Sequence, residues 1–389
     1  MTAVPIGPRH AGPPARGRSQ RGQATLLVVM LVGMATALLV YGMVDINSLA
    51  LRRDKNTAAA LADIKLALIG YAVSDANRPG ELPCPDVNND GQLTLGIDFT
   101  GGAGSPCVSL LGRLPWKTLG LPDLRDGSGE RLWYALSDNF HAGATPPLNS
   151  DTMGQLTVTG GAPATNVVAI VFSPGEVLGT QVRDAANENN VANYLEGENA
   201  NGDTIFTTGT VSTTFNDRLL VITTADLMPL VEMRVARELR ALLQAYRANS
   251  ACGCYPWADG SLPWTGEGDN DVLRGAPSLN PGDPELWGSG SIPPLPAWFL
   301  NNQWWRVIYY AVDPSKTETP TAGTLTVNAN PYDVVLIMTG PAGSGPLGNL
   351  RPSFDWTHYV DDTLNSDGNN AFVTPSSTAY ARDRLYTIP

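Results

Sequence analysis

The chain has 389 residues and a formal net charge of −12 at pH 7, and it is long enough to form two domains with cores of their own. Its 40 glycines and 31 prolines indicate many turns and loops rather than a helical bundle. Residues 1–22 contain four arginines and no acidic residue, so the rest of the chain is strongly acidic and would repel nucleic acid. We therefore expect no nucleic-acid partner.

The first predicted element is a long helix over residues 23–78, because no proline occurs there in an otherwise proline-rich chain. Its first part carries no charge between Arg21 and Asp45, and residues 24–44 are numerous enough to cross a hydrocarbon core of roughly 30 Å. No small-residue cleavage site of the A-x-A kind follows this stretch, which argues against a secretory signal peptide. The later part is amphipathic and predicts contact with a folded domain through one stripe of side chains: Leu61, Ile64, Leu68 and Tyr71.

A basic leader that ends in Gly22 and precedes such a helix resembles the type IV pilin and pseudopilin superfamily of pili and type II secretion systems. The resemblance implies cleavage between Gly22 and Gln23 by a prepilin peptidase. It also implies a bacterial inner-membrane protein with a periplasmic or cell-surface globular region, whose partners are other pilins or pseudopilins. The assembly contacts it implies lie along the membrane helix: Leu26, Leu27, Val29, Leu31, Leu38 and Leu39.

The sequence departs from the family pattern at two positions. Gln23 stands where members usually have Phe or Met, and Leu27 stands where most have a Glu that helps subunits dock. Some minor pilins and one tip pseudopilin also lack this Glu, so the departure favours a minor subunit over a major one. The alternative interpretation is an uncleaved single-span anchor.

An internal repeat extends over the remainder of the chain. The segment NVVAIVFSPGEVLGTQVR (166–183) resembles YDVVLIMTGPAGSGPLGNLR (332–351), and residues 193–222 match residues 358–388. Within the second match four pairs keep one offset of 166 residues: Phe206 with Phe372, Asp217 with Asp383, Arg218 with Arg384, and Leu219 with Leu385. A constant offset over several positions predicts two copies of one structural unit.

Each copy reads as a helix, then a loop rich in Cys, Pro and Gly, then short strands. In the first copy the strands are expected at 156–159, 167–172 and 219–223. The second copy begins with a predicted helix over 224–249, capped by Thr223 or Thr224, with one apolar side: Leu227, Val231, Val235, Leu239, Leu242 and Tyr246.

The predicted fold class is α+β, with a long membrane-spanning N-terminal helix followed by two tandem units at 79–222 and 223–389. In each unit a helix packs on a small antiparallel sheet, which is the layout that the pilin resemblance implies.

Four cysteines, Cys84, Cys107, Cys252 and Cys254, all follow the membrane span, where an oxidising compartment would pair them. Four cysteines allow three connectivities. The simplest joins Cys84 to Cys107 and Cys252 to Cys254, and a pairing between the two units remains open.

A calcium loop is predicted in the segment DVNNDGQ, where Asp86, Asn88, Asp90 and Gln92 alternate and Gly91 permits a sharp turn. The usual acidic twelfth ligand is replaced by Ile97, with Asp98 one position later. The alternative is a solvated turn stabilised by Asp and Asn side chains, and both interpretations stay open. Calcium also occurs in related pseudopilins.

No catalytic motif is recognisable, so we expect a protein that is not an enzyme. His141 lies near Asp138 and His358 near Asp355, but neither histidine follows a nucleophile in a recognisable turn. Seven of the nine tryptophans lie in the second unit, where they either fill a core or form a binding face.

The expected function is a minor pilin-like or pseudopilin-like filament component that primes, caps or decorates a filament, with adhesion through its larger loops. The alternatives are a membrane-anchored periplasmic hydrolase and a carbohydrate- or protein-binding protein.

Overall fold

The structure is a computed structural model, and it describes residues 21–101, 106–141, 147–260, 272–279, 286–342, 351–355, 358–374 and 382–389; the side chains of 21–29, 35 and 37–47 are not described. The chain falls into two compact units, Met1–Lys55 and Asn56–Pro389. The fold class is α+β, as predicted, with an N-terminal helix and several largely antiparallel sheets.

Helix α1 extends over Arg21–Ser74 and contributes to both units. It ends four residues earlier than predicted, because the Asp75 carboxylate accepts hydrogen bonds from the amides of Asn77 and Arg78 and so forms a turn. Within the described residues, Ser48–Ser74 is long and apolar enough to cross a membrane, and 33% of its apolar 18-residue window is buried. The predicted span 24–44 is helical in its backbone, but most of its side chains lie outside the described set.

The first sheet of the second unit has six strands in the order β1-β2-β4-β3-β5, with β6 also paired to β4. Their bounds are β1 Leu111–Arg113, β2 Trp133–Leu136, β3 Leu156–Gly160, β4 Ala164–Ser173, β5 Ile205–Thr208 and β6 Arg218–Thr223. Three short 3₁₀ helices lie between them: η1 Asp138–Phe140, η2 Val191–Asn193 and η3 Gly197–Ala200.

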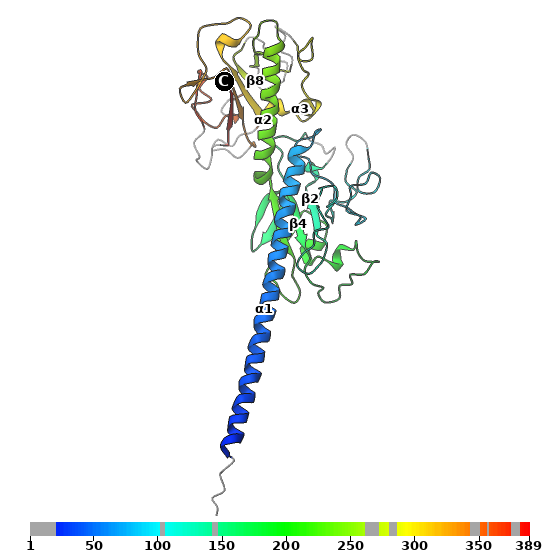
Figure 1. The fold of residues 1–389 in the computed structure, drawn as a ribbon. Coiled ribbons are helices and arrows are strands. Elements are labelled where there is room, and N and C mark those ends of the chain that lie inside the picture. The colour runs from blue at the N-terminus through cyan, green and yellow to red at the C-terminus, as the bar shows by residue number, and fades with distance from the viewer. Residues whose placement is uncertain are drawn as a thin grey trace, which may run out of the picture. The chain divides into compact units, whose positions relative to one another are not determined.

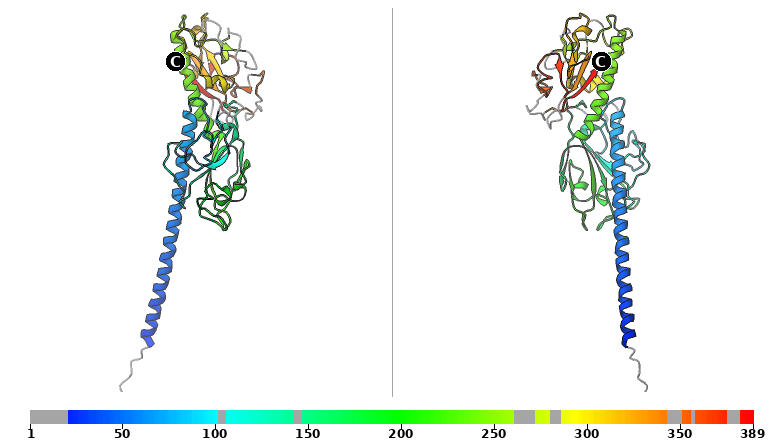
Figure 2. Two further views of the ribbon diagram at one scale, coloured as in Figure 1. Left: turned by 90° about the vertical axis from the view of Figure 1, so that its right-hand side faces the viewer. Right: turned by 60° about the vertical axis from the view of Figure 1, so that its left-hand side comes forward.

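Helix α2 occupies Thr224–Asn249, the predicted range. Thr223 caps it: its hydroxyl accepts the amide of Asp226, whose carboxylate accepts the amide of Thr223. The apolar side is buried as expected, except that Leu243 and not Leu242 is fully buried. Figures 1 and 2 show the end of α1 beside the sheet with β2 and β4, and α2 continuing to the sheet with β8.

The second large sheet has five strands in the order β14-β12-β9-β8-β7, and a small sheet has the order β11-β10-β13. The strand bounds are β7 Ala258–Asp259, β8 Arg274–Pro277, β9 Ile308–Val312, β10 Thr326–Val327, β11 Asn330–Pro331, β12 Val334–Met338, β13 Ala371–Phe372 and β14 Arg384–Ile388. The short helices of this part are α3 Ala297–Asn301, η4 Trp304–Val307 and η5 Pro314–Lys316.

The two large sheets share a strand arrangement. The antiparallel series β1-β2-β4-β6 has the same order as β8-β9-β12-β14. Each copy also holds one parallel pair, in which Val158 lies opposite Phe206 in the first and Val327 opposite Phe372 in the second. The segments 166–172 and 332–338 that resemble each other in sequence therefore hold equivalent places in the two large sheets, whereas the second parallel pair lies in the small sheet and the first in the six-stranded sheet.

One hydrophobic core joins α1, α2 and both large sheets. Alternate residues of β2 divide between two clusters: Tyr134 and Leu136 enter the shared core, while Trp133 and Ala135 enter a smaller cluster on the opposite face. Helix α1 contributes Ile64 and Leu68, which are completely buried. The first sheet is therefore covered by apolar side chains on both faces.

Candidate functional site

The first candidate site is the exposed apolar surface of α1 in the N-terminal unit. Among the side chains described there, Met30, Leu31, Val32 and Met34 are each 58% exposed. A helix that presents consecutive large apolar residues to solvent is unfavourable in water, since each buried aliphatic side chain contributes about 1.5–3 kcal/mol. This surface therefore suits a lipid or protein environment.

Of the residues predicted to make assembly contacts, only Leu31 has a described side chain, and it is among the exposed ones. The side chains of Gln23, Leu26, Leu27, Val29, Leu38 and Leu39 lie outside the described set. Gly22 and Gln23 lie in the first turn of α1.

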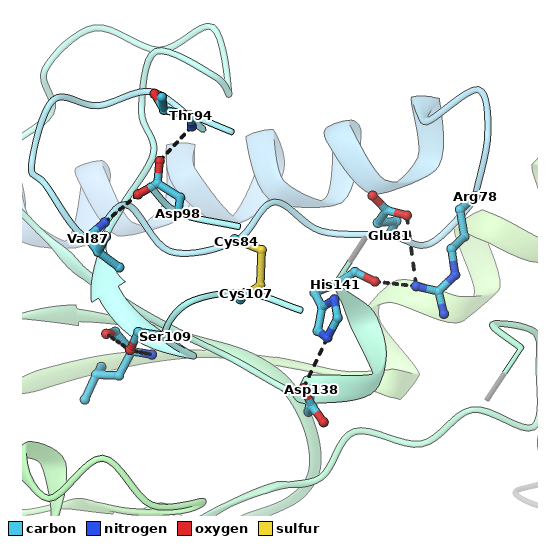
Figure 3. Close-up of a disulfide and its surroundings, with 11 residues drawn as sticks. Arg78, Glu81, Cys84, Val87, Thr94, Asp98, Cys107, Ser109, Asp138 and His141 are labelled. Carbon is cyan, nitrogen blue, oxygen red and sulfur yellow. Dashed lines mark hydrogen bonds and ion pairs between the residues drawn. A yellow bond between two sulfur atoms is a disulfide. The ribbon is translucent and has the colours of Figure 1, made fainter. Parts of the chain in front are cut away.

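The second candidate site is the loop closed by the Cys84–Cys107 disulfide (Figure 3). Its Cα atoms are 5.5 Å apart, an ordinary separation for a disulfide, and Cys84 is buried. Cys252 and Cys254 form the other pair, so the structure has the simplest of the three connectivities.

The predicted calcium ligands lie within this disulfide loop, and most of their oxygens accept backbone amides. Asp86 accepts the amides of Asn88 and Gly91, at 3.1 and 2.6 Å, and Asp90 accepts the amide of Gln92 at 2.7 Å. Asp98, one position after the missing twelfth ligand, is completely buried and accepts the amides of Val87 and Thr94 (Figure 3). Burial raises the pKa of Asp86, against the effect of its amide hydrogen bonds.

In the described residues, no three His, Cys, Asp or Glu side chains converge as a metal site. The calcium site stays a prediction. The hydrogen bonds of the loop are those of a turn stabilised by Asp side chains.

A buried network beside the disulfide connects the two halves of the second unit. Arg78 donates to the carbonyl of His141, and its guanidinium lies 4.0 Å from the Glu81 carboxylate (Figure 3). Arg78 also donates to Asn302 Oδ1 at 3.3 Å. Asn302 Oδ1 also accepts the amide of Leu148, from the first half. Burial lowers the pKa of Arg78, and burial together with Asp75 raises the pKa of Glu81 to about 7.

A cleft of about 430 Å³ lies where the two halves meet. Its central ion pair joins Arg351 to Asp151 at 2.9 Å, and the Asp151 carboxylate also accepts the amide of Ala342. Burial raises the pKa of Asp151, and Arg351 opposes that shift. The pair links a loop of the first half to the second half, and sequence reasoning missed it because the two residues belong to different copies of the repeat.

The histidines form local contacts. His141 is buried, with Nε2 3.2 Å from Asp138 Oδ1 as their spacing suggested. His358 Nδ1 lies 2.6 Å from Ser353 Oγ, a partner that the sequence did not indicate, and the same hydroxyl accepts the amide of Asp355.

Five of the seven tryptophans of the second half are described. Trp257, Trp298, Trp304 and Trp305 are buried, and Trp287 is half-buried. Trp298, Trp304 and Trp305 belong to the shared core and Trp287 packs against it, so these four form no exposed binding face. Trp264 and Trp356 lie outside the described residues.

The comparisons with known proteins identify no relative: no family model matches the chain, and no curated protein or solved structure matches it significantly.

Proposed function

We propose that the chain is a membrane-anchored, non-enzymatic component of a pilus or secretion filament of the pilin or pseudopilin type. Its stem, residues 24–44, lies in the bacterial inner membrane and packs against the stems of neighbouring subunits. The observation that carries the proposal is the uncovered run Met30, Leu31, Val32 and Met34 on a helix of the N-terminal unit. The basic leader ending in Gly22 supplies the cleavage site for a prepilin peptidase.

The remainder of the chain is proposed to be two tandem pilin-like units displayed outside the membrane. Two observations support this: the shared strand order, and the equivalent parallel pairs at Phe206 and Phe372. A doubled globular region is bulky, which suits the tip of a filament better than repeated packing along its shaft. The subunit would prime, cap or decorate the filament.

The decisive experiment is amino-terminal sequencing and intact mass of the membrane-extracted chain, with and without a coexpressed prepilin peptidase. We expect a mature chain that begins at Gln23 and appears only with the peptidase, and we expect Gly22→Ala to keep the leader. A chain that retains residues 1–22 in both preparations would reduce the stem to an ordinary anchor and refute the filament proposal.

A matched pair of variants tests the stem itself. Leu31→Glu places a charge on the proposed assembly surface, whereas Leu95→Glu changes a comparably exposed leucine, 64% against 58%, in the disulfide loop. We expect only Leu31→Glu to reduce recovery with the membrane and crosslinking to other pilins, because a buried charge in lipid or between stems is costly. Equal losses from both variants would contradict the proposal.

A second candidate, a ligand-binding protein, is favoured by the cleft between the two halves. The structure gives no hydrogen-bond partner to the side chains of Gln155, Gln303 and Arg306, which are among the described residues that line it. Carboxamides and a guanidinium offer the donors and acceptors that fix a polar ligand such as a saccharide. If the protein binds a member of an oligosaccharide panel and Arg306→Ala abolishes that binding, the result would support this function. The absence of binding to the whole panel would rule it out.

A further inference from the structure

An equivalent clamp holds one loop in each copy of the repeat. In the first copy, Asp217 immediately precedes β6, and its Oδ2 accepts the amide of Glu196 and the Nδ2 of Asn199, each at 2.9 Å. The Asn199 carboxamide in turn pairs with both backbone groups of Thr207, at 2.8 and 3.1 Å. The loop between residues 194 and 203 is thereby fixed to the start of β6.

The second copy repeats part of this arrangement, with Asp383, Asn365 and Val373 each 166 residues after Asp217, Asn199 and Thr207. Asp383 precedes β14, and its Oδ2 accepts the amides of Asp361 and Asp362, at 2.8 and 3.3 Å. Asn365 pairs with both backbone groups of Val373, at 2.8 and 3.0 Å. In both copies an aspartate before the last strand accepts loop amides, and an asparagine of that loop pairs with a strand backbone; the bond from Asn199 to Asp217 belongs to the first copy.

Each clamp leaves one buried carboxylate oxygen unsatisfied. Asp217 is 3% exposed and Asp383 is 5% exposed, and within the described part of the chain the Oδ1 of each has no hydrogen-bond partner. A buried acceptor without a partner is costly, and a buried charge more so.

A second carboxylate is anchored beside each aspartate. Glu196 Oε2 accepts the amide of Asn216, the residue before Asp217, at 3.0 Å. Asp361 Oδ2 likewise accepts the amide of Arg382, the residue before Asp383, at 3.3 Å. Two acidic side chains thus share one small site in each copy, and close carboxylates cannot both remain ionised without penalty.

We propose that each copy of the repeat binds one proton in this carboxyl pair, Asp217 with Glu196 and Asp383 with Asp361, and that the proton locks the adjoining loop onto the sheet. Protonation turns the unsatisfied Oδ1 into a hydroxyl donor, which gives its hydrogen to the neighbouring carboxylate while Oδ2 continues to accept the loop amides. Loss of the proton leaves two adjacent negative charges, which push the loop away.

The electrostatics agree with this arrangement. Burial, and then the neighbouring Glu196, raises the pKa of Asp217 to about 8, although its amide hydrogen bonds oppose the shift. Burial and Asp361 raise the pKa of Asp383 to about 7, and Arg351 is the charge that opposes this. Because these folded-state values lie above those of an unfolded aspartate, the stabilisation is complete in acid and is lost as the pH rises through the folded-state values.

Hydrogen–deuterium exchange of the full chain in detergent micelles tests the proposal, with rates divided by the intrinsic rate at each pH. Between pH 6.5 and 9 we expect protection to fall roughly thirtyfold for the loop 194–203 and roughly fourfold for the loop 359–368, as one proton with those pKa values requires. Protection of the central strand β4 should stay constant.

The variants Asp217→Asn and Asp383→Asn carry a permanent donor in place of the proton, so each should make its own loop insensitive to pH. The control is Asp313→Asn, a buried aspartate whose two oxygens accept the amides of Ser315 and Leu325. That variant should lower stability without changing the pH dependence of either loop.

Two outcomes would overturn the proposal. Loop protection that stays constant from pH 6.5 to 9 in the unmodified protein would show that no proton is bound there. Protection restored at pH 9 by millimolar calcium and removed by a chelator would identify the carboxyl pairs as cation sites instead.

Discussion

Removal of the Cys84–Cys107 disulfide should destabilise the protein far more than removal of Cys252–Cys254. The first bond joins residues 23 apart in sequence and the second residues only 2 apart. On the chain-entropy model, closing a loop of about 24 residues restricts the unfolded chain by roughly 3 kcal/mol, and closing three residues by only about half of that.

The local structure strengthens the contrast. The first bond encloses the buried Asp98, which accepts the amides of Val87 and Thr94, so opening it also loosens a hydrogen-bonded loop. In the second pair, Cys252 is exposed at the end of α2 and only Cys254 is buried. We therefore compare the double variants Cys84→Ala with Cys107→Ala, and Cys252→Ala with Cys254→Ala.

Urea unfolding of the oxidised full chain in detergent, followed by tryptophan fluorescence, measures the difference. We expect the first double variant to lose roughly 3 kcal/mol or more of unfolding free energy and the second less than about 2 kcal/mol. Reduction of the unmodified protein should reproduce the sum. The reasoning fails if the second variant loses as much as the first.

Three further outcomes are expected from the same protein. Thr223→Ala should lower the unfolding free energy by about 1 kcal/mol, because it removes the cap of α2. An unchanged thermal midpoint would show that the Thr223 cap does not stabilise the protein. Leu68→Ala should cost about 2–5 kcal/mol in urea unfolding, whereas Leu66→Ala, on the exposed side of the same helix, should be nearly neutral. If the loop at Asp90 binds calcium with a millimolar dissociation constant, 5 mM calcium should stabilise the unmodified protein by about 1 kcal/mol and the Asp90→Asn variant by less. An unfolding midpoint that does not change with calcium would show that the loop is a hydrogen-bonded turn and not a calcium site.

Elements with strong local signals were predictable from the sequence. Helix α2 follows from its cap at Thr223 and its apolar periodicity, and the strands β3, β4 and β6 follow from β-branched runs between turns. The end of α1 was misplaced because a single side chain, Asp75, competes for the next amides. The two-residue strands β7, β10, β11 and β13 carry too few residues to show any period.

The site residues divide in the same way. The offset that relates Asp217 to Asp383 is visible in the sequence, and the same offset relates Asn199 to Asn365, so an alignment at that offset contains the clamp. The burial of these two carboxylates could not be predicted from the sequence, because only the fold shows that they are shielded from water. The Arg351–Asp151 pair depends on how the two copies pack together, which no local pattern encodes.

Helix α2 packs against β4 and β6 of the first sheet and also against β12 and β14 of the second. Its apolar side enters the core that α1 and both sheets share. The two halves therefore share one interior, and a chain truncated before Thr224 would lose the part of the first sheet's cover that α2 supplies, while that of α1 would remain. Because α2 packs on both sheets, we expect the two halves to unfold together in one transition rather than as separate domains.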